Sequence, residues 1–167
     1  MKHLSILIAA TLLMAPSSVP AESAADTFVQ APEFALKDLD GKTHRLSQFR
    51  GRVVFLDFWA TWCGPCRMST PALVALGAKM KGKKFSIIGV SLDDSTEGVR
   101  EFADSMGVEH LILWGGGGTI NETYRVRGIP AFYLIDKKGR VRKHYPGYAP
   151  RMEADWERSA AALLAEK

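Results

Sequence analysis

Cysteine is scarce in this chain: two of its 167 residues are cysteines, Cys63 and Cys66, and they form a single CxxC motif. A structural zinc site needs four ligands, and no second cysteine pair exists to complete one. The histidines are scattered, at His3, His44, His110 and His144. The residue after the second cysteine is Arg67, where a c-type haem attachment motif has histidine. These absences argue against a metal site, a haem attachment site and a fold stapled by several disulfides.

A large excess of charge of one sign is also lacking, and so are long apolar runs. The formal net charge is +4, a mild balance that does not indicate nucleic-acid binding. The N-terminal apolar run, residues 4–14, is too short to span a bilayer comfortably. It follows Lys2 and precedes a small-residue stretch, which is the pattern of a cleaved signal peptide over residues 1–21. An uncleaved membrane anchor is the alternative.

Export implies an oxidising compartment, and we expect a periplasmic protein. Residues 22–30 are small and polar, which predicts a flexible start, and residues 31–167 are predicted to form one domain. A disulfide within a CxxC closes a very short loop and therefore gains little loop entropy, so a purely structural disulfide is the weaker alternative. The cysteine pair is better explained as a working redox site.

The CxxC motif organises the chain. It follows an apolar run at residues 53–58, predicted as a buried strand, and precedes a predicted helix at about 66–81. Cys63 therefore lies where a strand leads into a helix N-terminus, whose unpaired N–H groups and dipole favour a thiolate and lower its pKa. Two cysteines at this spacing can close and open a disulfide by exchange. The predicted chemistry is thiol–disulfide exchange.

The residues around this motif carry a resemblance. The matching segments are Asp57-Phe58-Trp59-Ala60, Trp62-Cys63-Gly64-Pro65-Cys66, Pro71, Arg127-Gly128-Ile129-Pro130, Ala31-Pro32-Glu33-Phe34 and Leu39-Asp40-Gly41-Lys42. Together they resemble the thioredoxin superfamily, and within it the exported thiol–disulfide oxidoreductases of TlpA/ResA type, a group related to the AhpC/TSA peroxiredoxins. The resemblance extends over residues 31–165.

The resemblance implies a thioredoxin-like α/β fold, with a mixed central β-sheet flanked by helices, an N-terminal β-hairpin and a helix–strand insert at about 93–114. The hydrophobic pattern agrees with this fold class. It predicts further strands at 85–91, 131–135 and 140–145, and helices at 119–124 and 151–167. The helix of the insert is expected to be capped within 93–96.

Two local features are also predicted. Ser47 is expected to cap a short helical turn that ends at Gly51. Arg140, Arg142 and His144 alternate along the last strand, which predicts a solvated sheet edge.

The resemblance assigns roles to the motif. Cys63 is the nucleophile and the more exposed cysteine, and Cys66 is the buried resolving thiol that forms the redox disulfide with it. Gly64 and Pro65 shape the turn between them, and in the family this dipeptide tunes the redox potential. Pro65 suits a first-turn helical position, where its missing N–H has no intrahelical partner.

Asp57 is a carboxylate in an otherwise apolar strand, six residues before Cys63. Burial raises the pKa of a carboxyl, which would make Asp57 a proton acceptor for Cys66. The alternative is a side chain that reaches a wet edge of the sheet. TlpA-like chains often carry Asn here, whereas thioredoxins carry Asp with a nearby Lys on the neighbouring strand. The strand at 85–91 has no Lys.

The resemblance also implies where substrate binds. The peptide bond between Ile129 and Pro130 is expected to be cis, and in the family this loop lies against the CxxC and receives the substrate backbone as an added strand. Trp62 is expected to be partly exposed and to contact substrate, with Trp59 packed inside. A plain core role for both tryptophans is the alternative.

The leading functional hypothesis is an exported, monomeric reductant of protein disulfides that needs no cofactor. Its electrons would come from a membrane thiol carrier, and its targets would be cysteines of apocytochrome c or of copper sites. A peroxiredoxin-like peroxidase is one alternative, but the Pro-x-x-x-Thr-x-x-Cys setting of a peroxidatic cysteine is missing. A copper metallochaperone is another, but such proteins typically use CxxxC.

Overall fold

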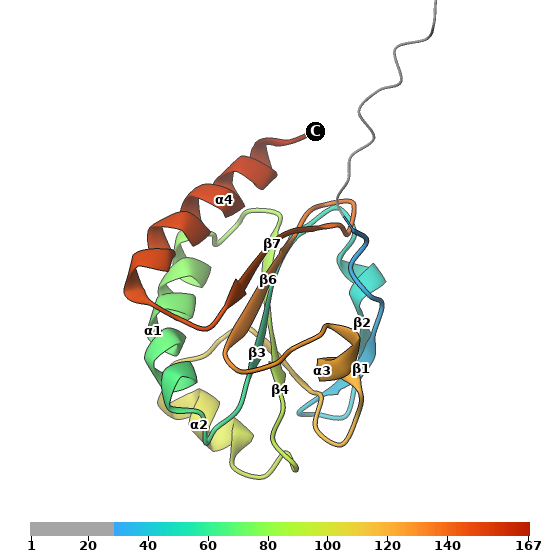
Figure 1. Cartoon of the computed structure of the whole chain (residues 1–167), viewed down its shortest axis with the longest axis vertical. Helices are drawn as coiled ribbons and strands as arrows, with labels where there is room; N and C mark the ends of the chain where they lie inside the picture. Colours follow the sequence, from blue (N-terminus) through green and yellow to red (C-terminus); the bar gives the residue numbers. More distant parts are fainter. Residues whose placement is uncertain (1–28) are drawn as a thin grey trace, which may run out of the picture.

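The computed structural model describes residues 29–167, which fold around one seven-stranded sheet (Figure 1). The strands are β1 (Ala35–Asp38), β2 (Thr43–Arg45), β3 (Val53–Trp59), β4 (Phe85–Ser91), β5 (Leu111–Trp114), β6 (Ala131–Ile135) and β7 (Val141–Pro146). The helices are η1 (Leu46–Phe49), α1 (Gly64–Lys79), α2 (Val99–Ser105), α3 (Ile120–Thr123), η2 (Pro150–Met152) and α4 (Glu153–Ala165). The predicted signal peptide lies outside the described residues.

The sheet is mixed, as the fold class predicted, with the strand order β2-β1-β5-β4-β3-β6-β7. Strands β3, β4 and β5 run parallel, and every other pairing is antiparallel. The predicted N-terminal hairpin is β1–β2, and the predicted insert contains α2 and β5. Because β5 pairs with both β4 and β1, the strand of the insert joins the hairpin to the central sheet.

Strand β3 is the centre of the core, and all seven of its residues are buried. Its side chains alternate between the two faces of the sheet. Phe55 packs in the cluster under α1 and α4, whereas Leu56 and Phe58 pack in the cluster that includes Tyr124 next to α3. Figure 1 shows α1 and α4 together on one side of the sheet and α3 on the other. Burial of each such side chain contributes about 1.5–3 kcal/mol.

The hairpin turn is closed by one carboxylate. Asp38 Oδ1 accepts hydrogen bonds from the backbone N–H groups of Asp40 (3.0 Å) and Lys42 (2.9 Å), and His44 Nε2 lies 2.7 Å from Asp38 Oδ2. Gly41 has a φ of 83°, a left-handed conformation that glycine adopts without strain. The Asp38 carboxylate and this glycine together close the turn between β1 and β2.

Two predicted caps are wrong. The short helix η1 begins after Arg45, and the Gln48 side chain accepts from the Arg45 N–H (3.0 Å), so Ser47 lies inside the turn. Helix α2 begins at Val99, because Gly98 before it has a φ of 73° that is incompatible with a helix. Asp93, expected as a cap, instead accepts hydrogen bonds from Thr61.

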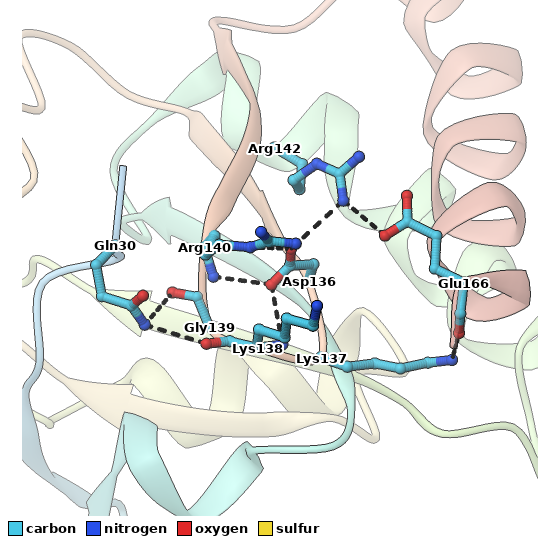
Figure 2. A network of polar contacts seen from close by, with 8 residues as sticks. All are labelled: Gln30, Asp136, Lys137, Lys138, Gly139, Arg140, Arg142 and Glu166. Carbon is cyan, nitrogen blue, oxygen red and sulfur yellow. Dashed lines mark hydrogen bonds and ion pairs between the residues drawn. The ribbon is translucent and has the colours of Figure 1, made fainter. Parts of the chain in front are cut away.

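The solvated edge predicted over 140–145 is also wrong for Arg140, which precedes β7, and for Arg142 within β7 (Figure 2). Arg140 Nη2 lies 2.7 Å from Oδ2 of Asp136, a carboxylate that is only 3% exposed. Arg142 Nη1 lies 3.4 Å from the same oxygen and 2.7 Å from Glu166 Oε2. Lys137 Nζ donates to the carbonyl oxygens of Leu164 (2.8 Å) and Glu166. The arginines therefore neutralise a buried acid and, with Lys137, anchor the end of α4 to the turn between β6 and β7.

Gln30 lies at the end of the segment that was predicted to be flexible, yet it is bound to the same turn. Its side-chain amide donates to the carbonyl oxygens of Lys138 (3.1 Å) and Gly139 (2.9 Å), as Figure 2 shows. Its backbone forms a bridge with Arg140. Gln30 is therefore held to the turn between β6 and β7 by its side chain and its backbone.

Candidate active site

The two cysteines lie where β3 leads into α1. Cys63 is the N-cap of the helix, Cys66 is in its first turn, and a disulfide joins them. The backbone N–H of Cys66 donates to Cys63 Sγ at 3.2 Å. The N-terminal N–H groups and the dipole of α1 are therefore directed at this sulfur, where they stabilise negative charge. Cys63 is 5% exposed and Cys66 1%, so an attacking thiol reaches Cys63 more easily.

Gly64 and Pro65 form the exposed start of α1. A Cβ added at Gly64 would meet no atom within 4 Å. Pro65 is at the second helical position, where the missing N–H costs no intrahelical hydrogen bond. Pro71 is inside the same helix, as predicted.

Asp93 positions the turn before the cysteines. Its carboxylate is buried and accepts from the Thr61 N–H (3.2 Å), from Thr61 Oγ1 (2.6 Å) and from Ser91 Oγ (2.7 Å). The local sequence pattern does not indicate this contact. The signal that would have found it is topological: parallel neighbours β3 and β4 end at the same edge of the sheet, so residues that follow them meet there.

Asp57 is buried beneath α1, at 5% exposure, so the predicted alternative of a wet edge is wrong. Burial raises the pKa of its carboxyl to about 8. Within residues 29–167, its Oδ1 atom has no hydrogen-bond partner. Thr70, one turn after Cys66, lines the same small cavity as Asp57, and its hydroxyl donates to the Cys66 carbonyl at 2.9 Å. The acid and the buried cysteine thus share a neighbour on α1.

Two large apolar side chains are exposed beside the disulfide. Trp62 is 69% exposed and Met68 65%. Trp59, in contrast, is buried against Phe102, with the ring centroids 5.2 Å apart. The expectations of an exposed Trp62 and a packed Trp59 are both confirmed.

Arg67 adds a positive charge beside this surface. Its Nε donates to the Thr61 carbonyl at 3.0 Å, and its guanidinium lies 5.1 Å from the centre of the Phe102 ring. The side chain is therefore oriented by two contacts while its residue stays exposed.

The peptide bond between Ile129 and Pro130 is cis, as the resemblance implied. Ile129 packs against the cluster of buried residues that contains both cysteines, so this loop lies on the same part of the core as the disulfide. A cavity of about 550 Å³ adjoins the loop. It is lined by Arg125, Arg127, Gly128, Ile129, Pro130, Ala131, His144, Pro146 and Gly147.

The chemistry of the site follows from these groups. Within the part of the chain that the structure describes, no three His, Cys, Asp or Glu side chains are grouped so that they could hold a metal ion. What is present is a disulfide at a helix N-terminus, with Cys63 slightly more exposed than Cys66 and a carboxyl of raised pKa beneath the helix. A reversible dithiol in this position, on a mixed sheet flanked by helices, defines a thioredoxin-like thiol–disulfide oxidoreductase.

Comparison with known proteins agrees with this class. The chain belongs to the AhpC/TSA family, whose sequence model matches residues 29–144. It is 37% identical to the thiol-disulfide oxidoreductase ResA of Bacillus thuringiensis subsp. konkukian over 118 residues, which cover 71% of this chain and 68% of ResA. It is also 37% identical to the thioredoxin-like protein YneN of Bacillus subtilis, over 75% of each chain.

Among solved structures, a Chlorobium tepidum protein assigned as the thiol:disulfide interchange protein DsbE is similar, with a TM-score of 0.78 and 36% identity. The match covers 84% of this chain and 99% of that protein. The thioredoxin-like fold and the oxidoreductase activity predicted from the sequence are therefore confirmed. No helix within residues 29–167 is both long and apolar enough to cross a membrane.

Proposed function

We propose that this oxidoreductase is exported to the periplasm and reduces disulfides of protein substrates there, in cytochrome c maturation or copper-site assembly. The observation that carries the proposal is the asymmetry of the cysteine pair: Cys63 caps the helix N-terminus and keeps 5% exposure, whereas Cys66, in the first turn, is 1% exposed. The periplasm oxidises thiols in general, so proteins that need free cysteines require a dedicated reductant. A membrane thiol carrier supplies its electrons.

The reaction has two exchange steps. In the reduced protein, the Cys63 thiolate attacks one sulfur of the substrate disulfide, a mixed disulfide forms, and the other substrate sulfur leaves as a thiolate. Cys66 then loses its proton to the Asp57 carboxylate and attacks Cys63 Sγ, which releases the second substrate thiolate. Two electrons pass to the substrate, and the Cys63–Cys66 disulfide remains.

Re-reduction of the Cys63–Cys66 disulfide by a thiol donor reverses these steps and uses the proton on the Asp57 carboxyl. When a donor thiolate attacks Cys63, Cys66 leaves as a thiolate in a buried site. The pKa of Asp57, raised to about 8 by burial, is close to that of a thiol, so at neutral pH most of the carboxyl is protonated and a smaller fraction is ionised. Asp57 therefore acts as the acid in this direction and as the base in the other.

Substrate binds across the surface between Trp62, Met68 and the Ile129–Pro130 loop. The two exposed side chains offer apolar contact, and an extended substrate segment adds its backbone along the loop. The cavity beyond the loop has two exposed arginines, Arg125 and Arg127, so a substrate with acidic residues near its disulfide fits best.

The test is a trapping experiment in periplasmic extract. Cys66→Ser keeps the attacking thiol and removes the resolving one, so we expect a mixed disulfide that is visible on a non-reducing gel and abolished by reductant. Cys63→Ser is the matched control and should trap nothing. Cytochrome or copper-site proteins in the trapped band support the dedicated reductant, whereas a broad set of exported proteins indicates a general oxidant or isomerase.

Redox direction is measured independently, from the equilibrium reduction potential of the Cys63–Cys66 pair. A value near about −270 mV, as in thioredoxin, supports a reductant, and a value near about −120 mV contradicts the proposal in favour of an oxidant.

A further inference from the structure

The space beside Asp57 is filled by a histidine from the insert. Asp57 on β3 is in register with Gly89 on β4. A Cβ at Gly89 would lie 2.9 Å from Trp59 Nε1 and 3.5 Å from His110 Nε2. The absence of a side chain at this position therefore admits the indole and the imidazole over the strand, on the face where Asp57 is buried.

A small cavity lies between the acid and the imidazole. Its volume is about 10 Å³, and it is lined by Asp57, Trp59, Thr70, Leu73, Phe102, Val108 and His110. A site of roughly 10–15 Å³ accommodates one water molecule, provided that two or more polar groups surround it. The Asp57 carboxyl, whose Oδ1 lacks a partner among the described residues, and the His110 imidazole supply such groups.

His110 also lies at the surface. It lines one open cavity of about 590 Å³ beside α1 and β4, and another of about 190 Å³ between the hairpin and α2. Among the lining side chains, the His110 imidazole is the one that lines the inner cavity and both open ones. The charged side chains that line these outer cavities are of both signs: Arg52, Lys81, Lys83, Glu109, Asp38, Asp40, Arg100 and Asp104.

The chemistry of the cavity lining singles out His110. Leu73, Phe102 and Val108 cannot exchange protons, and the Thr70 hydroxyl donates to the Cys66 carbonyl. Burial lowers the pKa of His110 to about 4, so the ring is neutral at working pH. A neutral imidazole has one donor and one acceptor nitrogen, and it can take up a proton at one while it releases a proton from the other.

We propose that His110, with one water in the cavity, carries protons between the Asp57 carboxyl and solvent. After Asp57 protonates the leaving Cys66 thiolate, its carboxylate regains a proton from the cavity water, the water takes one from His110, and His110 takes one from outside. The reverse sequence of transfers removes the proton from the Asp57 carboxyl and delivers it to solvent. The proposal rests on the proposed function only in taking Asp57 as the acid and base for Cys66, and His110 acts through Asp57 as a positioning and relay residue.

The test measures proton movement directly on the oxidised full-length protein. A rapid jump from pH 7 to pH 9 should deprotonate Asp57 (pKa about 8), and Trp59, which lines the same cavity, should report this by fluorescence. The same pH jump with Asp57→Asn measures the part of the fluorescence change that does not come from Asp57. In weak buffer, we expect His110→Gln to slow the Asp57 phase on the order of ten-fold or more. His44→Gln, which changes a histidine outside the cavity, is the matched control and should leave the rate unchanged.

A second variant separates relay from packing. His110→Ala should also be slow in weak buffer, and added imidazole should restore its rate, because a free imidazole can enter the vacated space and exchange protons there. An unchanged rate in His110→Gln overturns the proposal, and so does slowing in His110→Ala that imidazole does not relieve. Because no substrate is used, failure of the trapping experiment and failure of this one are distinguishable.

Discussion

Replacement of Asp57 by asparagine should stabilise the oxidised protein, by an amount that grows with pH. Burial raises the pKa of Asp57 from 3.8 to about 8, so the folded state binds the proton more tightly than the unfolded state. The contribution of the protonated Asp57 carboxyl to the free energy of unfolding is complete below about pH 4, and it is lost as pH rises to about 8. Each pH unit in this window costs about 1.4 kcal/mol, which amounts to roughly 4 kcal/mol at pH 7. Asparagine has a similar shape and carries no charge, so it escapes this cost.

The assay is urea unfolding of the oxidised wild type and Asp57→Asn from pH 4 to pH 9. We expect nearly equal free energies of unfolding at pH 4 and a variant that is more stable by several kcal/mol at pH 8. Asp155→Asn is a control of opposite sign, because hydrogen bonds from Lys143 and Tyr145 lower the pKa of Asp155. Removal of that carboxylate should cost a nearly constant amount of stability from about pH 5 to pH 9, because the cost shrinks only as pH falls below about 4. A constant difference between Asp57→Asn and wild type at all pH values would refute the reasoning.

Three further predictions concern the site itself. In the reduced protein, Cys63 should alkylate faster than Cys66 and reach half its maximal rate below about pH 8.5, and faster labelling of Cys66 would reverse the assigned roles. Asp57→Asn should slow repeated disulfide turnover while the circular dichroism spectrum stays unchanged, and an equal rate across pH 6–9 (roughly the range in which thiols titrate) would reduce Asp57 to a structural residue. Asp93→Ala should lower the free energy of unfolding by about 1–3 kcal/mol, because the donors of Thr61 and of the buried Ser91 lose their acceptor. Calorimetry measures this, with Asp94→Ala as the exposed control.

Features set by residues near one another in the chain were predictable from the sequence. The apolar run after residue 52 and the CGPC motif specify a buried strand followed by a helix N-terminus, and these alone place Cys63 as a cap and Cys66 beneath it. The strands at 85–91 and 131–135 were predicted with the bounds that the structure shows. Such features depend on local propensity, periodicity and turn chemistry, which act within a few residues.

Contacts between distant segments were decided only by the tertiary structure. Asp93 meets Thr61 because β3 and β4 are parallel neighbours, and His110 reaches the side of Asp57 because glycine lies at the register position opposite that acid. Arg142, which a period-two pattern places at a solvated edge, instead pairs with Glu166, 24 residues later in the chain. Strand order and register set these contacts, and both depend on how whole faces pack, which a local pattern does not encode.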